Sequence, residues 1–199
     1  MAHAAPIKAP EMTVTEFLTW DSGDPGTKYE LVDGVPRAMA PASRVHGTIQ
    51  ANLTGLLFEH LKGSRCQVLT EAGMVPSLKS DKNVRIPDVT VTCEAPNPDE
   101  KLVRNPKLII QIISPSNERD TWESIWACAS IPSLQEIIVV QSERVEVVVF
   151  PKDDEGHWPE HGTEFSIGST AGLKTLDATL SVADIYDKTG LIEAEAQSL

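Results

Sequence analysis

Three side chains, Glu30, Asp88 and Gln111, have types and positions that suit the chemistry of a polar site. Each stands at the edge or in the middle of an apolar stretch. Gln111 interrupts the apolar run 108–113, and burying an unpaired amide costs about 1–3 kcal/mol. Gln111 is therefore either a core amide that is hydrogen-bonded to a neighbouring element or a ligand within the site. The residues themselves leave both interpretations open.

The elements that must position these residues follow from hydrophobic periodicity and turn chemistry. Thr13 and Glu16 form a capping box for a short helix, Ser43 can cap a long amphipathic helix that ends at Gly63, and Asp33-Gly34 predicts a hairpin turn. A second helix is expected over 116–130 and a small one over 181–186. Strands are expected at 29–32, 35–39, 66–70, 74–77, 89–93, 108–113, 136–140, 144–150 and 164–167.

This order of elements predicts a single α/β (α+β) domain in which helices cover a sheet. We expect a flexible leader over 1–12, the domain over 13–187 and a frayed tail over 188–199. The chain has 199 residues, enough to bury a substantial core. It contains neither an apolar run of membrane-spanning length nor the apolar segment of a secretory signal, so a cytoplasmic protein without a membrane partner is expected.

Charge and cysteine content limit the function further. The chain carries 17 Lys and Arg against 29 Asp and Glu, a formal net charge of −12. Proteins that hold DNA through its phosphates usually present a basic face, so composition argues mildly against a DNA partner. The three cysteines, Cys66, Cys93 and Cys128, are odd in number and widely spaced. This pattern predicts reduced thiols that act as small core residues.

Several motifs in order resemble the Uma-two family of restriction-endonuclease-like proteins. They are Tyr-Glu-Leu-Val-Asp-Gly around Glu30, Pro-Asp-Val around Asp88, Ser-Pro-Ser at 114–116 followed by Asp120, and Ile-Pro-Ser-Leu-Gln-Glu at 131–136. The resemblance runs from about 13 to 186. It implies the PD-(D/E)XK nuclease fold, a mixed central sheet flanked by helices. It also implies Mg²⁺- or Mn²⁺-dependent hydrolysis of DNA, no organic cofactor, and a homodimer.

The resemblance assigns roles to five positions. Glu30 and Asp88 fall in the acidic metal-binding set, with Asp88 as the central ligand, and His46 falls close to the site. The family's next carboxylate corresponds to Gln111, and its lysine corresponds to Ser124. Gln111 would still offer the metal an oxygen but not a negative charge, and Ser124 cannot act as a cation. The family's nuclease chemistry is therefore expected to be impaired in this chain.

Simple physics supports that expectation. One unit charge at about 4 Å is worth about 4 kcal/mol at an effective dielectric near 20, and losing one preorganised donor typically lowers a rate ~10²–10³-fold. Neither Glu123, beside Ser124 on the helix, nor Lys107, four residues before Gln111, is placed to compensate. Two functions remain: a weakened metal-dependent endonuclease acting on DNA, and a non-catalytic module that binds a partner or assembles with itself.

Other candidate residues carry less weight. Trp122 and Trp126 could stack on bases, but their shared helical stripe favours core packing. His157 and His161 are four apart in a polar loop without further zinc ligands. The Ser-Pro-Ser stretch lacks the Gly-x-Ser-x-Gly elbow of a nucleophilic serine and predicts a turn.

Overall fold

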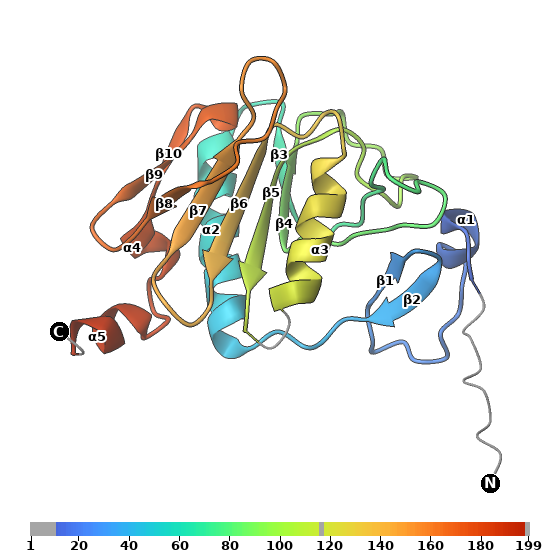
Figure 1. Cartoon of the computed structure of the whole chain (residues 1–199), viewed down its shortest axis with the longest axis horizontal. Coiled ribbons are helices and arrows are strands. Elements are labelled where there is room, and N and C mark those ends of the chain that lie inside the picture. Colours follow the sequence, from blue (N-terminus) through green and yellow to red (C-terminus); the bar gives the residue numbers. More distant parts are fainter. Residues whose placement is uncertain (1–10, 116–117, 198–199) are drawn as a thin grey trace, which may run out of the picture.

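A computed structural model describes residues 11–115 and 118–197, so residues 1–10 of the leader expected over 1–12, and Ser116 of the Ser-Pro-Ser motif, lie outside the described residues. Its centre is a six-stranded sheet of order β3-β4-β5-β6-β7-β8, in which β5 and β6 run parallel and the other neighbours run antiparallel (Figure 1). The strands are β3 (Gln67–Thr70), β4 (Val89–Thr92), β5 (Pro106–Ile113), β6 (Glu136–Gln141), β7 (Val147–Pro151) and β8 (Thr163–Phe165). The expected mixed sheet flanked by helices is confirmed.

Helices α2 (Arg44–Leu61) and α3 (Glu118–Ala129) cover opposite faces of this sheet (Figure 1). Side chains of β5 alternate between the two faces, as the period of a strand requires. Ile110 and Ile112 join the core cluster that contains the apolar stripe of α2, whereas Ile109 and Ile113 join the cluster that contains Ile125 of α3. Because β5 is buried on both faces, its sequence is a nearly continuous apolar run.

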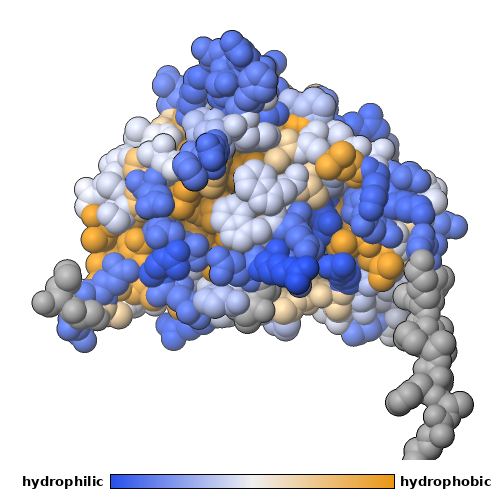
Figure 2. Space-filling model, viewed as in Figure 1, coloured by the Kyte–Doolittle hydropathy of each residue, from blue (hydrophilic) through white to orange (hydrophobic). Residues whose placement is uncertain are grey.

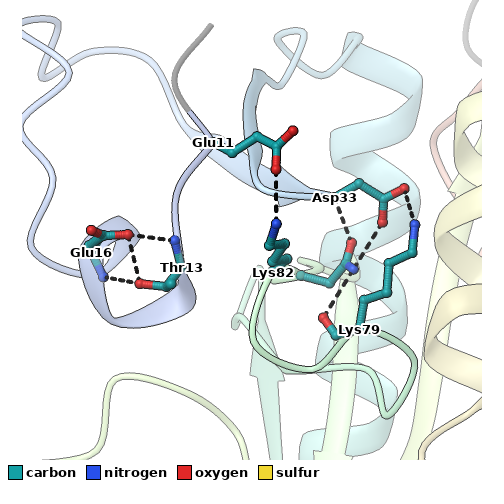
Figure 3. Close-up of polar contacts among 7 residues, drawn as sticks. Glu11, Thr13, Glu16, Asp33, Lys79 and Lys82 are labelled. Atoms are coloured by element: carbon teal, nitrogen blue, oxygen red, sulfur yellow. Dashed lines mark hydrogen bonds and ion pairs between the residues drawn. The ribbon is translucent and has the colours of Figure 1, made fainter.

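The expected helix starts are confirmed. Ser43 Oγ accepts from the backbone N–H of His46 at the start of α2. At α1 (Val14–Phe17), Thr13 and Glu16 form the reciprocal hydrogen bonds of a capping box (Figure 3). Both caps satisfy backbone donors that the first turn of a helix leaves without intrahelical partners.

Two hairpins lie beside the central sheet. The expected one pairs β1 (Tyr29–Val32) with β2 (Val35–Ala38), whereas β9 (Thr170–Leu173) and β10 (Ala178–Ser181), joined by the 3₁₀ turn η1 (Lys174–Leu176), were not expected. The strand expected over 74–77 is wrong, since only a single bridge between Met74 and Arg85 forms there. Apart from the bridges at Met74, Val84 and Arg85, the segment from Met74 to Asp88 is instead a loop.

The C-terminal part adds two short helices, α4 (Val182–Ile185) and α5 (Leu191–Ala196). Although a frayed tail was expected after residue 188, Leu191 and Ile192 of α5 pack against the core cluster on the α2 side. Glu195 Oε1 also accepts a 2.6 Å hydrogen bond from the backbone N–H of Val145. Within residues 11–115 and 118–197, no helix has the length and apolar character needed to cross a membrane.

The cysteine prediction is wrong for two of the three residues. Cys66 and Cys93 form a disulfide, whereas Cys128 is free and buried as expected. Gln67 pairs with Thr92 in the antiparallel β3–β4 ladder, so the two cysteines are the next residues facing each other beyond that pair. Their separation of 27 residues in sequence concealed this proximity.

Candidate active site

Asp88 lies immediately before β4 and is held by hydrogen bonds to both its side chain and its backbone. His46 Nε2, at the start of α2, lies 2.9 Å from Asp88 Oδ1, and the backbone N–H of Ile112 in β5 donates to Oδ2 at 2.7 Å. The Asp88 carbonyl accepts from Gln50 Nε2 at 2.9 Å and from the Glu71 backbone N–H at 3.1 Å. The geometry therefore places His46 next to Asp88, where the family resemblance expects it.

The β1–β2 hairpin delivers Glu30 and is tied to the loop that leads to Asp88. In Figure 3, Lys79 Nζ of this loop donates to Asp33 Oδ2 of the hairpin at 2.8 Å, and Lys82 Nζ donates to Glu11 Oε2, which precedes α1, at 2.8 Å; the Gly34 backbone N–H donates to the Lys82 carbonyl at 2.8 Å. The Asn83 side chain accepts from the Asp33 N–H and donates to its carboxylate. Since the bonds to Asp33 and Gly34 lie at the turn after β1, they fix the hairpin against the segment that precedes Asp88.

Glu30 shares its buried position with a cation that the sequence analysis did not select. Its Oε1 accepts a 2.6 Å hydrogen bond from the Ile86 backbone N–H, and its Oε2 lies 3.5 Å from Arg85 Nη1. Both side chains are nearly enclosed, with 15% of Glu30 and 8% of Arg85 exposed. Burial raises the pKa of Glu30, outweighing the lowering by the Ile86 hydrogen bond and Arg85, and the negative charge of Asp88 raises it further.

A signal for Arg85 existed in the sequence, because it stands three residues before Asp88 in Arg-Ile-Pro-Asp. An arginine this close to a candidate metal ligand can offset the charge of a nearby carboxylate, and here it pairs with Glu30. Its Nε is also buried without a hydrogen-bond partner among the described residues. Arg85 is thus an integral charge of this site.

Gln111 and Ser124 both lie at the interface between β5 and α3. Gln111 lies between Ile109 and Ile113 on the face of β5 that packs against α3, and Ser124 precedes Ile125 among the buried residues of that helix. The exposed fractions of Gln111 and Ser124 are 6% and 5%. Ser124 Oγ has no partner in the described part of the chain, and no hydrogen bond links the Gln111 amide to another described residue.

The sheet register joins this interface to Asp88. Val89 pairs with Ile110 in the antiparallel β4–β5 ladder, so Asp88 stands across from Gln111. Together with the link between Glu30 and Arg85, this brings the predicted acidic and amide residues to one end of β4 and β5.

The residues present do not fit a strongly bound Mg²⁺. The described residues contain no group of three or more His, Cys, Asp or Glu side chains that could hold a metal ion. Glu30 and Asp88 contribute two negative charges, but Arg85 offsets one of them and Gln111 adds none. Mg²⁺ is a hard cation that gives up its bound water reluctantly. Binding it strongly needs more negative charge than this set of residues offers.

The remaining sequence candidates lie outside the site. Glu123 is half-exposed and pairs with Arg119, so it does not replace the missing lysine. Trp122 packs against the α3-side cluster and stacks on Trp126, which is 49% exposed. The exposed His157 contacts acidic neighbours of its own loop instead of a metal site.

Comparison with known proteins agrees with this fold. The chain is 29% identical over 188 residues to the uncharacterized protein slr1290 of Synechocystis. This alignment covers 94% of this chain and 97% of that protein. A crystal structure of a "putative nuclease belonging to DUF820" from Anabaena variabilis superposes with a TM-score of 0.70 at 17% identity, covering 89% of this chain and 99% of that one. Residues 14–183 match the Uma2 family, which is described as "Putative restriction endonuclease". The chain belongs to this family and has its nuclease-like fold.

Proposed function

We propose that this chain is a restriction-endonuclease-like protein whose Mg²⁺-dependent hydrolysis of DNA is impaired. One observation carries the proposal: Gln111 and Ser124 occupy the β5–α3 interface as buried, neutral side chains. The family resemblance places a carboxylate and a lysine at these two positions. A metal-dependent nuclease uses such carboxylates to hold the cation that polarises the phosphoryl oxygen and lowers the pKa of the attacking water.

Arg85 and the raised pKa of Glu30 strengthen the proposal. A carboxyl that burial already favours in its neutral form is a poor ligand for a divalent cation, and the nearby guanidinium repels the cation. Asp88 remains the best-placed acidic group, but both of its carboxylate oxygens already accept or approach protein donors. Protein donors therefore already satisfy these carboxylates in the described part of the site.

Cleavage of supercoiled plasmid tests the proposal directly. The natural chain, the double variant Gln111→Glu/Ser124→Lys, and that double variant carrying Asp88→Ala are incubated with Mg²⁺ or Mn²⁺. We expect nicking only in the double variant, at a rate at least ~10²-fold above the natural chain, because a charge and a preorganised cation are restored. Loss of nicking on adding Asp88→Ala would assign the activity to this site. Comparable cleavage by the natural chain would overturn the proposal.

The second function is a non-catalytic module that binds DNA or assembles as a homodimer. It is favoured by the protein donors that already occupy Asp88 and Glu30, since the pocket needs no cation to stabilise these charges. Light scattering over a concentration series tests the homodimer. Fluorescence anisotropy with labelled duplex DNA at several salt concentrations tests DNA binding, because contacts to phosphates weaken as salt rises.

A further inference from the structure

A cavity of about 650 Å³ lies at the opposite end of the sheet from Asp88. Cys66 and Cys93 line it where β3 begins and β4 ends, and Lys107 lines it at the start of β5. Since a strand rises about 3.3 Å per residue, the four residues from Lys107 to Gln111 separate the two places by about 13 Å. The cavity is therefore distinct from the candidate active site.

Four basic side chains line this cavity in an otherwise acidic protein: Arg65, Lys107, Lys152 and Lys174. Among the described residues, Arg65, Lys107 and Lys152 form no ion pair with an acidic side chain. Lys174 alone is paired, to Asp154 at 2.9 Å.

The acidic groups around the cavity are already engaged. Asp153 Oδ1 accepts from the backbone N–H groups of Glu155 and His157 at 2.9 and 2.8 Å, which shapes the turn of the loop. The buried carboxylate of Glu136 accepts from the backbone N–H groups of Lys174 and Thr175 at 3.0 and 3.1 Å. These acids stabilise the cavity's walls, and among residues 11–115 and 118–197 they leave three cations without anionic partners.

Lys107 and Lys152 are both partly buried. Burial lowers the pKa of Lys152, and its Nζ lies 4.7 Å from the centre of the Trp158 ring. A partly desolvated ammonium gains from a bound anion, because charge-assisted hydrogen bonds are stronger than neutral ones. The cavity thus presents two ammonium groups that an anion would stabilise.

Size and surroundings point to a small ligand. Small-molecule sites usually have volumes of about 300–1,000 Å³, a range that includes this cavity. The loop between β7 and β8, which contributes Lys152, Asp153 and Gly156 to the lining, rises beyond this end of the sheet (Figure 1). Figure 2 shows it as a hydrophilic projection at the top of the molecule. This loop therefore supplies part of the wall of the cavity.

We propose that the cavity bounded by Arg65, Lys107 and Lys152 binds a phosphate-bearing small molecule of about mononucleotide size. The free cations supply the phosphate contacts, with Arg65 able to bind two phosphate oxygens side by side. The rest of the cavity accommodates the group that carries the phosphate. This site is independent of metal ions and of the residues around Asp88.

Isothermal titration calorimetry tests the proposal with inorganic pyrophosphate, AMP and a 12-nucleotide single strand, all in EDTA so that no metal takes part. We expect AMP and pyrophosphate to bind with a dissociation constant below about 1 mM. The double variant Lys107→Met/Lys152→Met should weaken both by at least ~10-fold, because two charge-assisted contacts are lost. Lys188→Met, which removes a lysine charge from an exposed position elsewhere, is the control and should bind as the natural chain does.

A second measurement covers the case in which the double variant does not fold. In the natural chain, AMP should protect Lys107 and Lys152 from acetylation, detected by mass spectrometry, while Lys188 is acetylated at an unchanged rate. Equal affinity in the double variant, no protection, or binding of the oligonucleotide alone would each overturn the proposal.

Discussion

The packing of Gln111 against α3 predicts that charges introduced at positions 111 and 124 will interact. The perturbation is a double-mutant cycle of Gln111→Glu, Ser124→Lys and both together. Both positions are almost completely buried, and neither side chain is hydrogen-bonded within the described residues. Each single variant therefore places an unpaired charge in an interface that has no partner for it.

The magnitudes follow from burial. An unpaired buried charge costs about 3–5 kcal/mol of unfolding free energy. At about 4 Å and an effective dielectric near 20, two opposite charges attract by about 4 kcal/mol. Measured couplings between contacting residues reach about 0.5–3 kcal/mol. We expect each single variant to lose about 3 kcal/mol, and the double variant to lose at least about 1.5 kcal/mol less than the sum.

Urea denaturation followed by circular dichroism measures all four unfolding free energies. The matched control combines Gln111→Glu with Glu123→Lys, since Glu123 is next to Ser124 but half-exposed and directed away from the sheet. Its coupling should stay within about 0.5 kcal/mol. Additive effects of the same size in the 111/124 cycle would show that the two side chains do not face each other, and would remove the argument for impaired catalysis.

Four further predictions use other parts of the structure. Thiol titration should find no reactive thiol in the native chain, because burial raises the pKa of Cys128 to about 12. It should find one thiol after unfolding and three thiols after unfolding with reductant. Reducing the Cys66–Cys93 bond should lower the unfolding free energy by about 3.5 kcal/mol, from the entropy of its 27-residue loop. Relative to Glu30→Gln, the natural chain should lose stability as pH rises through the raised pKa of Glu30, since the folded state binds that proton more tightly than the unfolded state. Thermal or urea unfolding at several pH values measures this, and a stability difference that stays constant across pH would contradict it. Tyr186→Phe should cost about 1–3 kcal/mol in urea unfolding, because the buried hydroxyl lies 2.8 Å from the Gln141 and Glu146 carbonyls and accepts from the Glu146 N–H.

Much of the fold could be predicted because its signals are local. The apolar run of β5, the stripe of Ile49, Leu53 and Leu57 on α2, and the caps at Thr13 and Ser43 each depend on residues within a few positions of one another. The β1–β2 turn at Asp33 and Gly34 likewise needs positive φ values, which both residues adopt. Local propensity and the global fold agree at all these places.

Features that depend on pairing between distant segments could not be predicted. The Cys66–Cys93 bond depends on the register between β3 and β4. The residues of β9 and β10 form a pattern that is too short and partly polar to predict a hairpin. The cavity for which we propose phosphate binding combines Arg65, Lys107 and Lys152 from three separate segments, so no spacing in the sequence reveals it.

The active site combines both situations. The motifs identify Glu30 and Asp88 as acidic residues of interest, but their electrostatic balance depends on Arg85, which comes to Glu30 from a different segment through the Leu31–Val84 and Met74–Arg85 bridges. The sequence motifs reveal that a carboxylate is missing at Gln111. The structure also reveals a cation, Arg85, next to a carboxylate that is present. Because Arg85 already neutralises one of the two remaining carboxylates, restoring the charge at Gln111 alone would return the site only to the charge that two free carboxylates would have given it. A carboxylate at position 111 is therefore expected to restore metal binding only in part while Arg85 stays beside Glu30.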